Sequence, residues 1–328
     1  MRQQPQLFKN MAGRFQRIRA HPATKRAVAA GQWILLALIV AYLLWRLTHI
    51  GWSAVLENLP ASPWFYIFLA LKFLSLPVAE TFVYQIIWER PLLSHFPAFI
   101  RKRVYNNAVA GYSGEAFLAL WARRRLGLSD LDAIVAVKDS NILSAFTANI
   151  MTVALIVWLA ASGGLGRAVD AVPAGPALFT IAFFMALSVA VGVLALRRRL
   201  VSLPWGKSRA ILGVHAVRQI AQIAIYSALY AAALPATPIG VWFSFVALQY
   251  VITRIPFLPN QELVYLTAAL SLGSIVGAPE EAVAGMLLAE AGLLQGLYFL
   301  LFFTTAHLAR SASNKSMTSP LPPLSDEP

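Results

Sequence analysis

The stretch that decides the fold is RKRVYNNAVAGYSGEAFLALWARRR, residues 101–125. A cluster of three cations at 101–103 precedes an apolar segment at 104–122, and three arginines follow it at 123–125. At about 1.5 Å per residue, an unbroken helix over this segment would be long enough to cross a lipid bilayer. Such a helix would separate the two cation clusters, whereas a helix that turns back would keep both on one side.

The composition is that of a membrane protein. Hydrophobic residues make up 59% of the 328 residues and charged residues 12%, against about 25% charged residues in a soluble domain. The net charge of +13 would indicate nucleic-acid binding in a soluble protein. Here the cations flank apolar segments, a pattern that reflects membrane topology and anionic lipid headgroups, so no nucleic-acid partner is expected. The lack of cysteine excludes disulfides and thiolate metal sites, and no metal or cofactor is expected.

The apolar segments predict the fold class, because a membrane-spanning helix needs about 20 mainly apolar residues. Two segments, 104–122 and 257–276, are ambiguous. The expected fold is an all-α polytopic transmembrane helical bundle of seven to eight crossings with one or two re-entrant broken helices. The segments expected to cross are 33–49, 64–88, 131–160, 176–196, 211–234, 239–255 and 279–305.

Positive charge predicts the orientation, because cytoplasmic loops of membrane proteins are enriched in Lys and Arg. With the N-terminus inside, 19 of the 27 Lys and Arg residues fall in four cytoplasmic segments, whereas the external loops at 50–63, 161–175 and 235–238 contain only Arg167. The expected location is the cytoplasmic (inner) membrane of a bacterium, with a cytoplasmic N-terminus. The four cytoplasmic segments are 1–31, 89–103, 123–125 and 197–209.

This orientation predicts a helical hairpin at 104–122. Its expected break is the motif GYSG at 111–114, where glycines permit a turn. Such backbone persists at membrane depth only when it is buried in protein or lines a wet cavity. A second break is expected at Pro256 and Pro259. After it, 257–276 either crosses outward or turns back, and the cations after the last helix favour crossing, with the C-terminus inside.

The chain divides into three segments. Residues 1–31 hold seven cations and no acid, with apolar side chains on one helical face. They predict an amphipathic helix on the anionic inner leaflet, with a frayed solvated tail as the alternative. Residues 32–305 form the expected transmembrane domain, and residues 306–328, which are rich in Ser and Pro, predict a disordered tail.

Polar side chains inside apolar helices are costly, so they indicate function or internal pairing. The segment 211–234 has a polar stripe within about 120° of one helical face. This stripe predicts either an aqueous cavity or an interhelical hydrogen-bond seam. Its members are His215, Arg218, Gln219, Gln222, Tyr226 and Tyr230.

Other charges in the apolar segments are expected to pair between helices. Lys72 and Glu80 lie about 12 Å apart along one helix, too far to pair directly, so each is expected to meet a partner on another helix. Lys138 and Asp139 are adjacent near the inner end of their helix. They either line the cavity or are interfacial charges.

The motif around Ser113 has three interpretations. Ser113 is a candidate N-cap of a half-helix, where the dipole favours the carboxylate of Glu115 and where anionic groups also bind. The motif also resembles the serine motif of rhomboid intramembrane proteases, and His307 resembles part of their histidine dipeptide. A serine nucleophile needs a base within hydrogen-bond reach, but His307 is expected at a helix end. The chain contains no HExxH, P-loop or GxGxxG motif, and no enzyme activity is expected.

The hairpin further resembles the transmembrane region of lysylphosphatidylglycerol synthases, part of a broad flippase-like family of bacterial and archaeal membrane proteins. Ala110 stands where the family has proline, Leu118 where it often has arginine, and the second break lacks the family's glycines. The residues after 305 are not expected to form a globular domain, so the resemblance is not expected to extend to lysyl transfer. The matching positions are Asn107, Gly111, Gly114, Glu115, Ser129 at the start of the next helix, the pair Lys138-Asp139, and Pro256, Pro259 and Glu262 at the second break.

The resemblance implies translocation of a lipid or lipid-linked molecule through a cavity built from broken helices. One alternative is a non-transporting accessory or lipid-binding subunit of an envelope lipid or glycan biosynthesis complex, and a remote one is an intramembrane serine protease. The expected partners are membrane lipids with anionic headgroups and an envelope-biosynthesis enzyme. The expected cavity-lining residues are Asn107, Gly111, Ser113, Gly114, Glu115, Lys138, Asp139, His215, Arg218, Gln222, Pro259 and Glu262.

Overall fold

A computed structural model describes residues 52–109, 111–172, 174–255 and 261–317, together with Ile34, Ala41, Trp45 and Thr48. Side chains are described as far as Thr304. The amphipathic segment expected at 1–31, most of the first expected crossing, and Pro256 and Pro259 lie outside the described residues. Within these ranges the chain forms helices joined by turns and contains no strand, which confirms the all-α class.

Among the described residues, four helices are long and apolar enough to cross a membrane, judged by length and composition. Their bounds agree with four of the expected crossings to within about one residue at most ends. The exception is the last helix, which continues beyond 305, so the first part of the expected disordered tail is helical. The four helices are α4 (Pro63–Trp88), α7 (Asp130–Ala161), α9 (Gly175–Ala195) and α14 (Glu280–Met317).

The helix with the polar stripe, α11 (Trp205–Ala233), is 29 residues long and starts before the expected 211. It packs along α4 and also contacts α7 and α12. At about 1.5 Å per residue it is longer than the hydrocarbon core of a bilayer. Its length is therefore that of a spanning helix, although its polar side chains make it less apolar than the four above.

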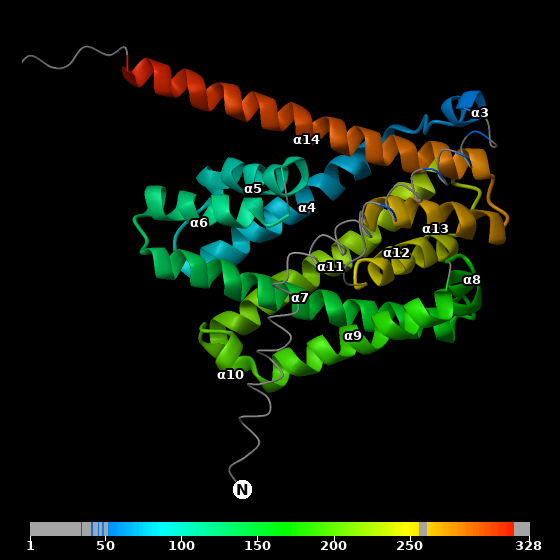
Figure 1. Cartoon of the computed structure of the whole chain (residues 1–328), viewed down its shortest axis with the longest axis horizontal. Helices are drawn as coiled ribbons and strands as arrows, with labels where there is room; N and C mark the ends of the chain where they lie inside the picture. The colour runs from blue at the N-terminus through cyan, green and yellow to red at the C-terminus, as the bar shows by residue number, and fades with distance from the viewer. Residues whose placement is uncertain are drawn as a thin grey trace, which may run out of the picture.

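The segment at 104–122 forms a helical hairpin together with the residues on either side of it. α5 (Phe96–Ala108) and α6 (Ser113–Leu126) lie side by side and contact each other (Figure 1). The break falls at the expected motif, but the residue in the left-handed conformation is Tyr112, with a φ of 66°. The turn therefore does not use the conformational freedom of glycine, contrary to the expectation from the sequence.

Gly114 is required for a different reason, which is the close approach of α5 and α6. A Cβ atom at this position would overlap the backbone oxygen of Lys102 and lie 2.8 Å from Asn106 Oδ1. The Gly114 amide donates a 2.7 Å hydrogen bond to the same Asn106 oxygen. The Ser113 hydroxyl donates a 2.7 Å hydrogen bond to the Tyr105 carbonyl. Ser113 thus joins the two helices, and it is not the N-cap that the sequence predicted, since Tyr112 occupies that position.

Replacing Gly114 by Ala should destabilise the hairpin, although alanine is the better helix former by about 1 kcal/mol. The overlap with the Lys102 oxygen forces α5 and α6 apart, and overpacking of this kind costs about 1–3 kcal/mol. The matched control is Gly111→Ala, because a Cβ atom at Gly111 meets nothing within 4 Å. We expect a lower melting temperature in detergent for Gly114→Ala than for Gly111→Ala. Equal melting temperatures would contradict the proposed packing.

A second, shorter pair of helices corrects the prediction of a full crossing at 239–255. α12 (Ile239–Ile252) has 14 residues and α13 (Gln261–Ile275) has 15, so each is only about 21–23 Å long. Neither reaches across a hydrocarbon core of about 30 Å. The two helices lie side by side on the same side of the molecule as α8 (Leu165–Asp170), and α13 contacts α8 (Figure 1). The chain therefore turns back after α12, whereas the cation count had favoured an outward crossing of 257–276.

The two hairpins lie at opposite ends of the bundle (Figure 1). α5, α6 and the short helix α10 (Arg197–Leu200) lie at one end, with the clusters of Lys and Arg. α3 (Trp52–Glu57), α8 and the connection between α13 and α14 lie at the other. The long helices α4, α7, α9, α11 and α14 connect these ends. The turn of the first hairpin lies between them along the bundle and is exposed at Tyr112 (78%).

Candidate functional site

Two adjoining polar cavities lie between the hairpins. One of about 390 Å³ is lined by residues of α6, α7, α11 and α12, and one of about 240 Å³ by residues of α4, α5, α11, α12, α13 and α14. Tyr226 and Gln249 line both cavities, so the two share a wall. In a bundle whose long helices expose Leu, Ile, Val and Phe, this is a concave polar region in an apolar body, which is where ligand sites are found.

Both chain breaks reach these cavities. Tyr112, at the tip of the first hairpin, lines the larger cavity together with Thr253 and Arg254, which follow α12. Asn107, near the end of α5, lines the smaller cavity together with Glu262, near the start of α13. The two hairpins enter from opposite ends and therefore contribute residues to the same site.

Three arginines at the cavities make no ion pair with any described residue. Arg103 is only 9% exposed, donates a 3.1 Å hydrogen bond to the Tyr298 hydroxyl and has no hydrogen-bond partner for Nη1. Arg218 donates to Gln222 and Ser144 at 3.0 and 3.1 Å, and its Nε has no partner. Nε of Arg254 likewise has none.

Arg103 and Arg218 lie close enough to repel each other electrostatically. Buried cations normally lie beside a carboxylate. The Glu80 carboxylate also attracts Arg218, but neither arginine forms an ion pair with a described residue. Two guanidiniums in a region of low dielectric create a positive potential that favours an anionic group beside them.

Three carboxylates near the cavities, Glu80, Glu115 and Glu290, form ion pairs with lysines, whereas Glu262 also lines the smaller cavity. Lys102 of α5 forms ion pairs with Glu80 of α4 and, at 3.2 Å, with Glu115 of α6. Lys72 of α4 pairs with Glu290 of α14. The expectation that Lys72 and Glu80 each meet a partner on another helix is confirmed.

The polar stripe of α11 lines a cavity and also forms hydrogen bonds with neighbouring helices. Arg218, Gln219, Gln222 and Tyr226 line the larger cavity. Gln219 also accepts a 2.6 Å hydrogen bond from the Tyr250 hydroxyl, and the hydroxyls of Tyr230 and Tyr265 are 2.9 Å apart. Both interpretations of the stripe therefore apply. The middle of α11 lines the cavity and also bonds to Tyr250, and near the end of the helix Tyr230 bonds to Tyr265.

Lys138 and Asp139 lie at a different contact. Asp139 is fully buried and accepts hydrogen bonds from the amides of Ser202 and Leu203 at 2.8 and 3.1 Å. Lys138 donates a 2.8 Å hydrogen bond to the Leu200 carbonyl. The pair fixes the segment that leads into α11, and neither residue lines the two polar cavities.

The remaining expected site residues divide in the same way. Asn107, Glu115, Arg218, Gln222 and Glu262 line one or other cavity. Gly111, Ser113, Gly114 and His215 do not, and Pro259 lies outside the described residues. His215 is 2% exposed. Ser129 caps α7, since its hydroxyl accepts a 3.1 Å hydrogen bond from the Asp132 amide, as the resemblance implied.

Several cavity residues are not identified by the sequence analysis. Arg103 belongs to the cation cluster at 101–103, which reads as a cytoplasmic loop, yet its side chain is almost completely buried. Three others lie at the end of the apolar segment 239–255, which the sequence predicts to be a membrane-spanning helix. They are Gln249, Tyr250 and Arg254. An available signal was the group of polar side chains just before Pro256.

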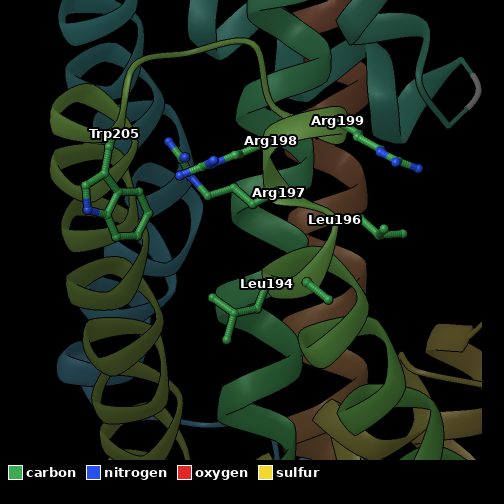
Figure 2. Close-up of a pocket in the computed structure, with 7 residues that line it drawn as sticks. Leu194, Leu196, Arg197, Arg198, Arg199 and Trp205 are labelled. Atoms are coloured by element: carbon green, nitrogen blue, oxygen red, sulfur yellow. The ribbon is translucent and has the colours of Figure 1, made fainter.

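A separate hollow of about 670 Å³ lies at the end of the bundle where α9, α10 and α11 meet. Figure 2 shows that Arg197 and Arg198 point towards Trp205, whereas Arg199 points away. The Arg197 guanidinium lies 4.3 Å from the centre of the Trp205 ring, a cation–π contact. The cations and the tryptophan at one end are typical of a membrane interface.

Comparison of the chain with protein-family models, curated proteins and solved structures gives no match. The described part of the chain thus belongs to the class of α-helical proteins that have helices long and apolar enough to cross a membrane, four in these residues, and it holds polar cavities that contain arginine.

Proposed function

We propose that this protein resides in a bacterial inner membrane and moves a lipid, or a lipid-linked molecule, with an anionic headgroup between the two leaflets. The observation that supports this function is the convergence of two hairpin tips on polar cavities that hold three arginines without carboxylate partners. A polar cavity lowers the barrier for a headgroup in the hydrocarbon region. Unpaired guanidiniums favour an anion, since they bind phosphate through charge-assisted hydrogen bonds.

The proposed topology places the N-terminus and the arginine-rich end in the cytoplasm. The α5–α6 hairpin then enters the membrane from the cytoplasmic side and the α12–α13 hairpin from the external side. With the segment at 33–49 as the first crossing, α4, α7, α9, α11 and α14 complete six crossings. Tyr112 in the turn of the first hairpin and Thr253 and Arg254 after α12 line a polar cavity, which is a setting in which such backbone is tolerated in a membrane.

This arrangement suits access from alternate sides. Each hairpin separates the cavities from one end of the bundle, so displacement of one hairpin would open the site to one leaflet only. Discontinuous helices that meet near mid-membrane are used in this way by transporters. The ion pair between Lys102 and Glu115 joins the first hairpin across its own two helices and fixes its shape.

The test is reconstitution into vesicles that contain fluorescent phosphatidylglycerol, with leaflet exchange followed by dithionite quenching. We expect exchange that depends on the protein and falls at least about tenfold in Arg218→Gln, because a charge-assisted hydrogen bond is worth about 1.5–3 kcal/mol. Arg199→Gln is the matched control, since Arg199 lines neither of the two polar cavities. No exchange by the wild type, with retained lipid binding, would favour the accessory lipid-binding subunit instead.

A further inference from the structure

An apolar groove of about 600 Å³ runs between the exposed faces of α4 and α11. Leu74, Val78 and Phe82 line it from α4, and Val214 and Val217 from α11. Val217 is 68% exposed and Phe82 45%. In the proposed topology these side chains face the acyl chains of the bilayer, so the groove has the chemistry and the setting to hold a hydrocarbon chain.

Two polar side chains interrupt this apolar lining, Ser75 and Arg218. Arg218 also lines the 390 Å³ polar cavity on the inner side of α11. Ser75 accepts a 3.5 Å hydrogen bond from Gln222, which lines the same cavity. The wall between the groove and the cavity therefore contains polar side chains at this level, and Arg218 contributes to the lining of both.

We infer that the groove holds an acyl chain of an anionic phospholipid whose phosphate is bound by Arg218, and that this lipid enters the polar cavity sideways between α4 and α11. The inference rests on the proposed function, since it names the substrate class and its route. A ligand with a hydrocarbon chain and an anion at one end matches an apolar groove that Arg218 borders. A lipid with net negative charge is favoured over a zwitterionic one, because Arg218 would repel the ammonium of the latter.

The first experiment measures binding without transport. The full-length protein is reconstituted with trace phosphatidylglycerol or phosphatidylcholine, each with the same photoactivatable acyl chain, and labelled peptides are quantified by mass spectrometry. We expect α4 and α11 to be labelled by phosphatidylglycerol about tenfold more than by phosphatidylcholine. This preference should disappear in Arg218→Gln, and excess water-soluble glycerol phosphate should not abolish it. Equal labelling by the two lipids would show that the groove holds only non-selective boundary lipid, and it would overturn the inference.

The second experiment tests the route. Val217→Trp fills the groove and should lower both the labelling and the leaflet exchange of phosphatidylglycerol about tenfold. Val191→Trp is the control, because Val191 is 57% exposed on α9, away from the groove, and it should change neither. Unchanged exchange in Val217→Trp would overturn the route. Selective labelling without any exchange by the wild type would instead overturn the proposed function and leave the lipid site intact, so the two failures are distinguishable.

Discussion

Replacing Lys102 by Met should produce the largest loss of stability of any single substitution in this chain. The Lys102 side chain is 3% exposed and is the ion-pair partner of both Glu80 and Glu115, which come from two other helices. Without it, two carboxylates remain close together in a region of low dielectric with no cation between them. Breaking one buried pair costs about 3–5 kcal/mol, and here two interactions are lost together. We expect little or no folded protein by size-exclusion chromatography in detergent.

Neutralising the stranded carboxylates should reverse this effect. In the triple variant Lys102→Met, Glu80→Gln, Glu115→Gln, no uncompensated charge remains, and folded protein should be recovered. Lys207→Met is the control for loss of a lysine, because its partner Glu89 is 73% exposed, and an ion pair at the surface contributes only about 0–1 kcal/mol. Failure of the triple variant to recover would show that Lys102 acts through packing, not through charge.

The long helices were predictable from sequence because their information is local. An apolar segment of sufficient length specifies a helix and its approximate ends, and α4, α7 and α9 begin and end close to the expected residues. The hairpin of α5 and α6 was predictable for another reason, namely that a cation cluster on each side restricts how the segment can lie. No equivalent pair of clusters flanks α12, so its continuous apolar sequence gave no sign that the helix is short.

The pairing of side chains was not predictable, because it depends on which helices become neighbours. The sequence shows that Lys72 has no partner on its own helix, but Glu290 is 218 residues away. Arg103 illustrates the same limit in reverse. Its place in a triple cation suggests a solvated loop, whereas α14 packs against α5 and buries it beside Tyr298. Burial is a property of the packed bundle, so composition alone assigns such a residue to the wrong environment.

Removing Lys72 and Glu290 together should leave the stability nearly unchanged, whereas removing either one alone should lower it. Their side chains are 6% and 8% exposed, and the pair joins α4 to α14. We expect Lys72→Met and Glu290→Gln to lower the free energy of unfolding by about 3–5 kcal/mol each, because each leaves one buried charge unpaired. The double variant Lys72→Met, Glu290→Leu removes both charges, and such replacements are often neutral. Free energies measured by SDS titration, monitored by tryptophan fluorescence, would reveal this non-additivity.

The same double variant separates stability from function, because both residues line the smaller cavity beside Glu262. If the pair serves only to join helices, the stable double variant should exchange lipid between leaflets as fast as the wild type. We expect instead a slower exchange, by about tenfold, because Lys72 and Arg103 lie on the same cavity and an anion that passes there loses one of its two cations. The exchanged pair Lys72→Glu, Glu290→Lys keeps both charges in the cavity and should restore part of the rate. A double variant that is stable and fully active would restrict the anion path to the larger cavity at Arg218 and Arg254.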